Sequence, residues 1–301
     1  MHTSHLLALF LASTLSTLSH AADSPPQTEK ISLWANHAPI GDGSFQTADP
    51  TITVHHPSHP NGTAVVICPG GGYGGLVTGP EGHGIATWLN AHNITGVVLE
   101  YRLPHGHPFI PLLDAQRAIR IVRSHAKDWA LLPNRIGICG FSAGGHLAST
   151  AGTHFDSGDL NSSDPIAQFS SRPDFLILIY PVITLGDKGH QGSKVNLLGP
   201  NPSPELVDLF SNQKQITDKT PPTFLAHALD DRVVPPENSL WFYQTLQEKK
   251  LPAKYLELPT GGHGLNGYRG PSWDAWQTQS LIWLADSNLI PQADASIQSP
   301  K

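Results

Sequence analysis

The chain has 301 residues, of which 39% are hydrophobic and 14% are charged, and its formal net charge is −6. This length allows one or two domains and is sufficient to bury a sizeable core. The sparse charge, without any block of like charges, excludes the basic surface typical of proteins that bind nucleic acid. The sequence contains no H-E-x-x-H or comparable pattern, so no metal site is predicted.

The first 21 residues have the pattern of a secretory signal peptide. Residues 6–18 form an apolar segment, and residues 19–21 (S-H-A) supply the small-x-small pattern of a cleavage site. The apolar segment is too short, and too rich in serine and threonine, for a membrane span. We therefore expect a signal peptide over residues 1–21, a flexible lead-in over 22–30, and a protein that is periplasmic or secreted.

Apolar runs typical of strands alternate with helix-compatible segments over most of the remaining chain. Residues 51–54 alternate polar and apolar side chains, as a strand with one wet face does. Further strands are predicted at residues 64–68, 96–100, 136–139, 175–180, 223–228 and 254–258. Helices are predicted at residues 81–92, 110–129, 236–250 and 272–286. This alternation predicts an α/β domain over residues 31–290, with a mostly parallel, doubly wound sheet and helices on both faces.

A glycine-rich loop, P-G-G-G-Y-G-G at residues 69–75, follows the first buried strand. Gly70, Gly72 and Gly75 match the G-x-G-x-x-G dinucleotide fingerprint, and Glu100 ends the next strand, where a ribose-binding carboxylate is expected. Glu100 is, however, rather far along the chain for this fingerprint. A Gly-Pro pair also interrupts the segment in which the phosphate-binding helix should run.

The same loop also suits an oxyanion hole, because glycine lets backbone N–H groups approach a developing alkoxide closely. A strand–turn–helix pattern at residues 136–147 supplies the nucleophile that such a hole requires. Residues 140–144 (G-F-S-A-G) fit the G-x-S-x-G nucleophile elbow, in which a serine occupies a sharp, strained turn between small neighbours. The hydroxyl of Ser142 then projects clear of the sheet, and the N–H of Ala143 points at the same space.

Between residues 181 and 222 the alternation of strand and helix patterns is interrupted. Glycines and prolines punctuate this segment, and only residues 205–211 have a helical pattern. A long insertion of this kind is typical of a functional lid or of an irregular excursion. We expect a small cap over the site, inserted after the strand that ends near Tyr180.

Two later loops carry the other residues that a nucleophilic serine requires. Asp230 and Asp231 follow the strand at 223–228, where the chain order Ser…Asp…His places the acid, and both qualify chemically. His263 lies in a glycine-rich loop, T-G-G-H-G at residues 260–264, with little to pack against. Its position, last in chain order, suits a general base.

The two cysteines, Cys68 and Cys139, each end an apolar run just before a glycine turn. We interpret them as buried, small hydrophobic residues in neighbouring core strands. Export would also permit a disulfide between them. At the other end of the chain, residues 291–301 are expected to form a disordered tail.

Four motifs therefore occur in order: P-G-G-G-Y at 69–73, G-F-S-A-G at 140–144, D-R-V-V-P at 231–235 and G-H-G at 262–264. With them the chain resembles the α/β-hydrolases over residues 31–289. More closely, it resembles the exported bacterial branch of acetyl-xylan esterases and feruloyl-esterase-like proteins, which is related to the catalytic domains of hormone-sensitive lipase and prolyl oligopeptidase.

The resemblance implies a catalytic triad in which Ser142 is the nucleophile and His263 the base. It implies that Asp231, rather than Asp230, is the acid, because the acid of the family stands four residues before the proline of a D-x-x-V-P pattern. It also implies an oxyanion hole, made by the N–H groups of Gly71, Gly72 and Ala143. The chain departs from the family at position 69, where proline replaces histidine.

The activity implied is that of a serine carboxylesterase that works without a cofactor through an acyl-enzyme. O-acetylated xylan or its oligosaccharides are the substrate class implied. Tyr73, beside the oxyanion glycines, and Tyr268, after His263, either stack on sugar rings or line a pocket wall.

Three alternatives stay open from the sequence. A peptidase of the prolyl-oligopeptidase type would share the triad, although the chain has no added domain of propeller size. A nicotinamide-dependent oxidoreductase would use the loop at residues 70–75 and Glu100. A carbohydrate-binding relic of a hydrolase would need a broken triad, whereas all three triad residues are present.

Overall fold

The structure is a computed structural model, and it describes residues 27–35, 37–39 and 49–295. The signal peptide predicted at 1–21, and residues 22–26 of the predicted lead-in, lie outside the described residues.

The described strands form one eight-stranded sheet in the order β1-β2-β4-β3-β5-β6-β7-β8. They are β1 (Gln27–Ser32), β2 (Thr51–His56), β3 (Ala64–Cys68), β4 (Thr95–Glu100), β5 (Ile136–Phe141), β6 (Leu176–Ile179), β7 (Thr223–Ala228) and β8 (Ala253–Leu258). β1 pairs with β2, and β2 with β4, in antiparallel register; all neighbours from β4 to β8 are parallel. The prediction of a mostly parallel sheet is confirmed.

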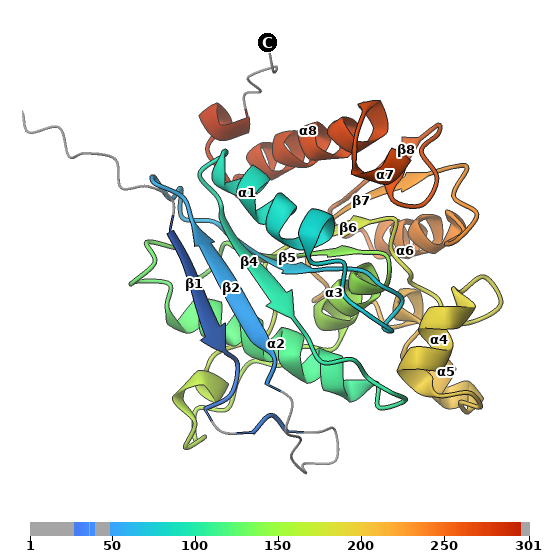
Figure 1. Cartoon of the computed structure of the whole chain (residues 1–301), viewed down its shortest axis with the longest axis horizontal. Helices are drawn as coiled ribbons and strands as arrows, with labels where there is room; N and C mark the ends of the chain where they lie inside the picture. The colour runs from blue at the N-terminus through green and yellow to red at the C-terminus, as the bar shows by residue number, and fades with distance from the viewer. Residues whose placement is uncertain (1–26, 36, 40–48, 296–301) are drawn as a thin grey trace, which may run out of the picture.

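Helices cover both faces of this sheet, as Figure 1 shows, with α1 and α8 on one side and α2 and α3 on the other. The helices are α1 (Gly84–Asn90), α2 (Phe109–Ser124), α3 (Ala143–Thr153), α4 (Gln191–Leu198), α5 (Pro204–Leu209), α6 (Glu237–Glu248), α7 (Leu265–Tyr268) and α8 (Pro271–Asp286). A π-helical turn, η1 (Gly79–His83), precedes α1, and three short 3₁₀ segments are η2 (Pro165–Gln168), η3 (Asn212–Lys214) and η4 (Gln292–Ala295).

The alternating side chains of the central strands divide the interior into two cores. In β3, Val65 and Ile67 pack on the side of α1 and α8, whereas Val66 and Cys68 pack on the side of α2 and α3. Both sets are fully buried, which explains why this strand is an uninterrupted apolar run. Burial of each large aliphatic side chain contributes about 1.5–3 kcal/mol.

Two predictions about the ends of the domain are wrong in part. Residues 27–30 do not belong to a flexible lead-in, because they form most of β1, whose exposed polar side chains suit an edge strand. Residues 291–295 do not belong to a disordered tail either. The side chain of Asp294 accepts hydrogen bonds from Asn61 at 2.8 Å and from Asn93 at 3.0 Å, which fixes η4 against the domain.

The cysteine interpretation is confirmed. Cys68 and Cys139 are buried free thiols on the neighbouring strands β3 and β5. Burial raises the pKa of both thiols well above the ordinary value, so they remain protonated, small hydrophobic groups.

The insertion at 181–222 is more helical than its sequence indicated, because α4 forms in addition to α5. The imidazole of His190 caps α4 by accepting a hydrogen bond from the N–H of Ser193 at 3.2 Å. Within the described part of the chain, no helix is long and apolar enough to cross a membrane.

Candidate active site

Ser142 occupies the turn between β5 and α3, with φ 52° and ψ −119°. A positive φ is strained for a residue with a side chain, and such strain is characteristic of functional turns. Glycine is required on both sides because the backbones come into contact there. A Cβ on Gly140 would lie 2.1 Å from the carbonyl oxygen of Gly144, and a Cβ on Gly144 would lie 2.1 Å from that of Cys68. The G-x-S-x-G spacing is thus a packing requirement of this turn.

The predicted triad residues come together at the carboxyl ends of three parallel strands. Oγ of Ser142 lies 2.9 Å from Nε2 of His263, and Nδ1 of His263 lies 2.8 Å from Oδ2 of Asp231. Because the carboxylate accepts the Nδ1 proton, Nε2 of the neutral ring is left free to accept the serine proton.

Asp231 is held as a carboxylate by several donors. Its Oδ1 accepts hydrogen bonds from the N–H groups of Val233 at 2.9 Å and Val234 at 3.0 Å. Its Oδ2 accepts from His263 and from His227, whose Nε2 lies 3.2 Å away. Burial raises the pKa of this carboxyl, but the hydrogen bonds from the two histidines outweigh it, and the pKa is lowered far below its ordinary value.

His227 was not identified from the sequence, and its tautomer follows from its contacts. Its Nε2 also lies 3.0 Å from the carbonyl oxygen of Val234, which can only accept, so the proton is on Nε2. Its Nδ1 then accepts from the hydroxyl of Ser239 at 2.8 Å. The ring is fully buried, and it helps to orient the carboxylate of Asp231 by donating to Oδ2, the same oxygen that accepts from His263.

The side chain of Asp230 has a different partner from that of Asp231. Its Oδ1 accepts a hydrogen bond from the N–H of Gly262 at 2.8 Å, and so it fixes the loop that carries His263 rather than the imidazole itself. The structure therefore brings Asp231, and not Asp230, to the histidine ring.

The glycine-rich loop approaches Ser142 from β3. Among the described residues, none accepts a hydrogen bond from the N–H groups of Gly71, Gly72 or Ala143, the donors predicted for the oxyanion hole. Glu100, the residue considered for a ribose, instead accepts hydrogen bonds from Lys30 and Thr51 at the sheet edge.

Residues 55–246 match the BD-FAE family. An acetylxylan esterase from Xylanibacter ruminicola is 38% identical over 248 residues, which cover 79% of this chain and 48% of that protein. The chain belongs to the BD-FAE family. Endo-1,4-beta-xylanase B from Butyrivibrio fibrisolvens is 37% identical over 217 residues, 70% of this chain and 34% of that protein. The chain thus spans about half and about a third of the lengths of these two relatives.

A solved structure from Caldicellulosiruptor lactoaceticus, described as an acetyl ester-xyloside bifunctional hydrolase, is also similar. It is 42% identical, has a TM-score of 0.82 and covers 87% of this chain and 97% of its own. The predicted α/β-hydrolase fold of this BD-FAE protein is thereby confirmed.

The insertion of this BD-FAE protein contacts the glycine loop through α4. Nδ2 of Asn196 donates a hydrogen bond to the carbonyl oxygen of Gly72 at 2.9 Å. The Cε1 atom of His190 is 3.8 Å from the position that a Cβ on Gly72 would occupy. Burial and the nearby His263 lower the pKa of His190, although Asp231 opposes them. The neutral ring, with Nδ1 accepting from Ser193, therefore carries its proton on Nε2 beside the loop.

The prediction that Tyr73 contacts a sugar is wrong. Its side chain is only 2% exposed, and its ring packs edge-on against Tyr101. Its hydroxyl bonds to Nδ1 of the buried His146 at 2.9 Å. The side chain of Tyr73 is therefore part of the core beside the glycine loop, and it has no exposed surface that a substrate could contact.

Tyr268 lies at the end of a left-handed turn. All five residues from Gly264 to Tyr268 have positive φ, so the segment labelled α7 is not a regular right-handed helix. The turn is anchored by the buried Leu265 and by a 2.8 Å hydrogen bond from the N–H of Tyr268 to the carbonyl oxygen of Gly264.

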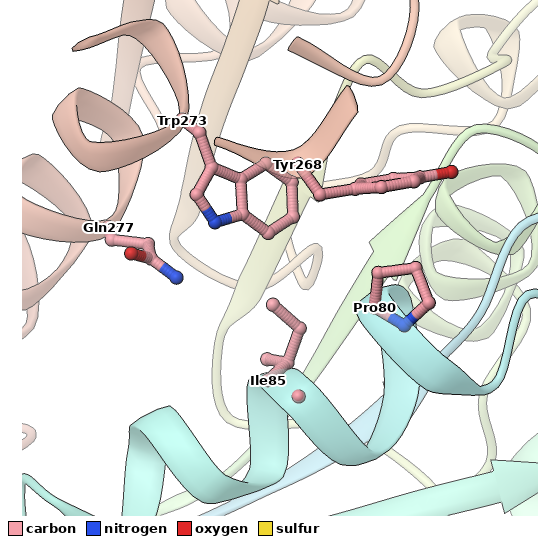
Figure 2. A pocket seen from close by; sticks show the side chains of 6 residues that line it. Pro80, Ile85, Tyr268, Trp273 and Gln277 are labelled. Atoms are coloured by element: carbon pink, nitrogen blue, oxygen red, sulfur yellow. The ribbon is translucent and has the colours of Figure 1, made fainter. Parts of the chain in front are cut away.

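Beside Tyr268 is a pocket of about 170 Å³ between α8 and the start of α1. Figure 2 shows the rings of Tyr268 and Trp273 on one side, Ile85 and Pro80 on the other, and the carboxamide of Gln277 at the rim. No described residue accepts a hydrogen bond from the indole N–H of Trp273 or from this carboxamide. The pocket thus combines apolar walls with two available donors.

Sequence reasoning also missed Glu81 and Tyr180, which lie directly beside the triad. Glu81 is 3% exposed, and its Oε1 accepts a hydrogen bond from the hydroxyl of Tyr180 at 2.9 Å. The ring of Tyr180 contacts that of His263 edge-on, with centroids 5.0 Å apart. A glutamate in the first turn of a helix is ordinary, so nothing in the sequence distinguished Glu81 from a surface residue. No group of three metal-ligating side chains is found among the residues that the structure describes.

Proposed function

We propose that this protein is a serine carboxylesterase that removes acetyl groups from O-acetylated xylan or xylo-oligosaccharides. One observation carries the proposal: Ser142, His263 and Asp231 form a continuous hydrogen-bonded series, with links of 2.9 and 2.8 Å. The relatives named for acetylxylan esterase and xylanase, and the similar acetyl ester-xyloside hydrolase, support both the ester chemistry and the substrate class.

In the first step, Oγ of Ser142 attacks the acetyl carbonyl while Nε2 of His263 takes its proton. The carbonyl oxygen becomes an alkoxide, which the N–H groups of Gly71, Gly72 and Ala143 stabilise. Each such donor typically contributes about 3–4 kcal/mol to the transition state.

The tetrahedral intermediate then collapses. The carbon–oxygen bond to the sugar breaks, and His263 returns its proton to the departing sugar hydroxyl. Water next attacks the acetyl-serine as His263 accepts one of its protons. Acetate leaves, and the proton returns to Ser142, so the cycle needs no cofactor and no net proton uptake by the enzyme.

Asp231 supports both steps from the opposite side of the ring. Its charge stabilises the imidazolium, and its hydrogen bond to Nδ1 keeps Nε2 directed at Ser142. The carboxylate itself stays ionised, because its four donors hold its pKa far below the ordinary value.

The pocket beside Tyr268 is the place we propose for a sugar of the substrate. Its aromatic walls suit the apolar face of a pyranose, and the donors of Trp273 and Gln277 suit sugar hydroxyls. Tyr268→Ala should raise KM for acetylated xylo-oligosaccharides and leave 4-nitrophenyl acetate hydrolysis little changed. Tyr243→Ala, on α6, is the matched control. Equal effects of Tyr268→Ala on both esters would contradict the assignment.

Export belongs to the same proposal, and the apolar segment at 6–18 with its S-H-A pattern supports it. N-terminal sequencing of the protein from the periplasm or medium of its host should give Ala22 as the first residue. A mature protein that retains Met1 would overturn this part.

The deciding experiment is acetate release from acetylated xylan, run beside 4-nitrophenyl acetate, methyl ferulate and an acetyl-amide analogue. The wild type should release acetate from xylan, and Ser142→Ala should lose about 10⁴-fold or more in kcat. If only 4-nitrophenyl acetate is hydrolysed, the proposed serine mechanism stands and acetylated xylan is rejected as the substrate. Substantial activity in Ser142→Ala would reject the mechanism.

A further inference from the structure

Glu81 is a buried acidic residue to which the mechanism above gives no task. It lies in η1, the π-helical turn that precedes α1, and only 3% of it is exposed. Such turns occur frequently at functional sites. Its Oε2 accepts the N–H of Gly70 at 2.7 Å, its Oε1 accepts the hydroxyl of Tyr180 at 2.9 Å, and the hydroxyl of Tyr268 lies near it.

The first of these donors belongs to the loop of the proposed oxyanion hole. Gly70 immediately precedes the proposed donors, and a Cβ placed on it would lie 2.7 Å from Oε2 of Glu81 and 3.0 Å from Cβ of Ser142. The loop, the carboxyl group and the nucleophile are therefore packed together, without space for a side chain between them.

Tyr180 and the nearby Tyr268 flank the proposed base. The ring of Tyr180 contacts the imidazole of His263, and Tyr268 ends the left-handed turn that begins directly after His263. One buried carboxyl group thus connects the two halves of the site, which come from distant segments of the chain.

The surroundings of Glu81 favour its charged form by geometry. Both hydrogen-bond partners, Gly70 and Tyr180, have a proton to donate, and a carboxylate is the form that only accepts. Burial is the largest influence and raises the pKa of Glu81 above its ordinary value, and the hydrogen bonds from Gly70 and Tyr180, with the nearby Tyr268 and His263, offset only part of this rise. Tyr101 and Cys139 are the other titratable groups near this charge. Among these described neighbours, His263 can carry a compensating positive charge during catalysis.

We propose that Glu81 is a positioning residue, whose carboxylate holds the oxyanion loop and the His263 loop in register and supports the imidazolium formed in the transition state. This inference rests on the proposed function of Ser142 and His263. The groups that face His263 are then Asp231 at Nδ1, Ser142 at Nε2, and Tyr180, Glu81 and His190 around the ring.

Glu81→Gln tests the charge with little change in shape. We expect kcat to fall about 10- to 100-fold with KM changed less than threefold, because misplacement and lost charge affect the transition state. The acidic limb of kcat/KM against pH should move to lower pH, because a nearby negative charge favours protonated imidazole. Glu100→Gln is the matched control, since that carboxylate binds Lys30 and Thr51 at the sheet edge, and both parameters should stay as in the wild type.

One further variant and an active-site titration separate position from charge and guard against misfolding. Tyr180→Phe keeps the carboxylate but removes one of its two donors, so kcat should fall about tenfold with the pH profile retained. Titration with a serine-directed phosphonate counts the folded sites in every preparation that retains Ser142, and a thermal melt checks the fold of Ser142→Ala. Wild-type kcat and pH profile in Glu81→Gln, beside an inactive Ser142→Ala, would overturn the role of Glu81 alone. An active Ser142→Ala would instead overturn the proposed function.

Discussion

Asp230 and Asp231 are adjacent in sequence, yet they bind different groups of the loop that carries His263: one binds its backbone and the other the imidazole ring. Asp231 accepts a hydrogen bond from the ring of His263 at 2.8 Å, whereas Asp230 accepts one from the backbone N–H of Gly262, also at 2.8 Å. One carboxylate therefore orients the imidazole, and the other fixes the backbone that carries it.

This arrangement predicts unequal effects of the same substitution at the two positions. Asp231→Asn places an amide donor against Nδ1 of His263 and favours the wrong tautomer, so kcat should fall about 10⁴-fold. Asp230→Asn keeps an oxygen that can accept from Gly262 and should cost less than about tenfold. Steady-state kinetics on 4-nitrophenyl acetate measure kcat of both variants. Equal losses of kcat in Asp231→Asn and Asp230→Asn would contradict the distinct roles of the two carboxylates.

The glycine loop offers a second matched pair. Gly71 has φ 127°, and a Cβ on it would lie 2.2 Å from the carbonyl oxygen of Gly75, whereas a Cβ on Gly75 would meet nothing within 4 Å. Gly71→Ala should distort the oxyanion donors and lower kcat about 10²- to 10³-fold. Gly75→Ala should leave kcat near the wild-type value, with thermal melts confirming that both variants fold. A dinucleotide fingerprint would require Gly75 but not Gly71, so a severe loss in Gly75→Ala would revive that alternative.

A further prediction concerns substrate binding by His190, which lies in the insertion at 181–222. Cε1 of its ring lies beside Gly72, and its Nε2–H has no acceptor among the described residues, so this N–H is available to a substrate oxygen. His190→Ala should raise KM for acetylated xylo-oligosaccharides by about 5- to 20-fold, the value of one hydrogen bond. His56→Ala, at the end of β2 next to the edge strand β1, is the control. An unchanged KM in His190→Ala would show that the ring serves only to cap α4.

Most of the fold was predictable because buried parallel strands produce continuous apolar runs. The apolar runs predicted the bounds of β3 to β7 within a residue or two. The turn at Ser142 was predictable because only glycine fits at Gly140 and Gly144, where the backbones are in contact. β1 was missed because an edge strand with exposed side chains has the polar composition of a loop. Secondary structure near the surface therefore depends on hydrogen-bonding partners that composition does not reveal.

The triad residues were identified because each lies in an unusual local sequence, whereas the residues around them were not. His227 ends an ordinary apolar strand, Glu81 begins an ordinary helix, and Tyr180 ends the run of β6. Their roles come from contacts across 99 residues of chain in the case of Glu81 and Tyr180. Tyr73 was misassigned for the same reason, because its position beside the loop does not reveal that the ring points inward.

A last prediction concerns stability, through the buried His146 on α3. Its Nδ1 bonds to the hydroxyl of Tyr73 at 2.9 Å, its Nε2 donates to the carbonyl oxygen of Phe210 at 2.7 Å, and Thr150 and His154 lie nearby. Burial lowers the pKa of this imidazole from 6.5 to about 4. Between these values the unfolded chain binds a proton that the folded chain does not, so stability rises with pH and is lost as pH falls.

The contribution of His146 should be complete above pH 6.5 and should decrease by on the order of 3 kcal/mol as the pH falls to about 4. Urea denaturation across this window should therefore give a steeper pH dependence for the wild type than for His146→Gln, which has no proton to gain. His56→Gln, at the end of β2, is the control for losing a histidine elsewhere. Parallel curves for the wild type and His146→Gln would mean that the buried imidazole does not govern acid stability.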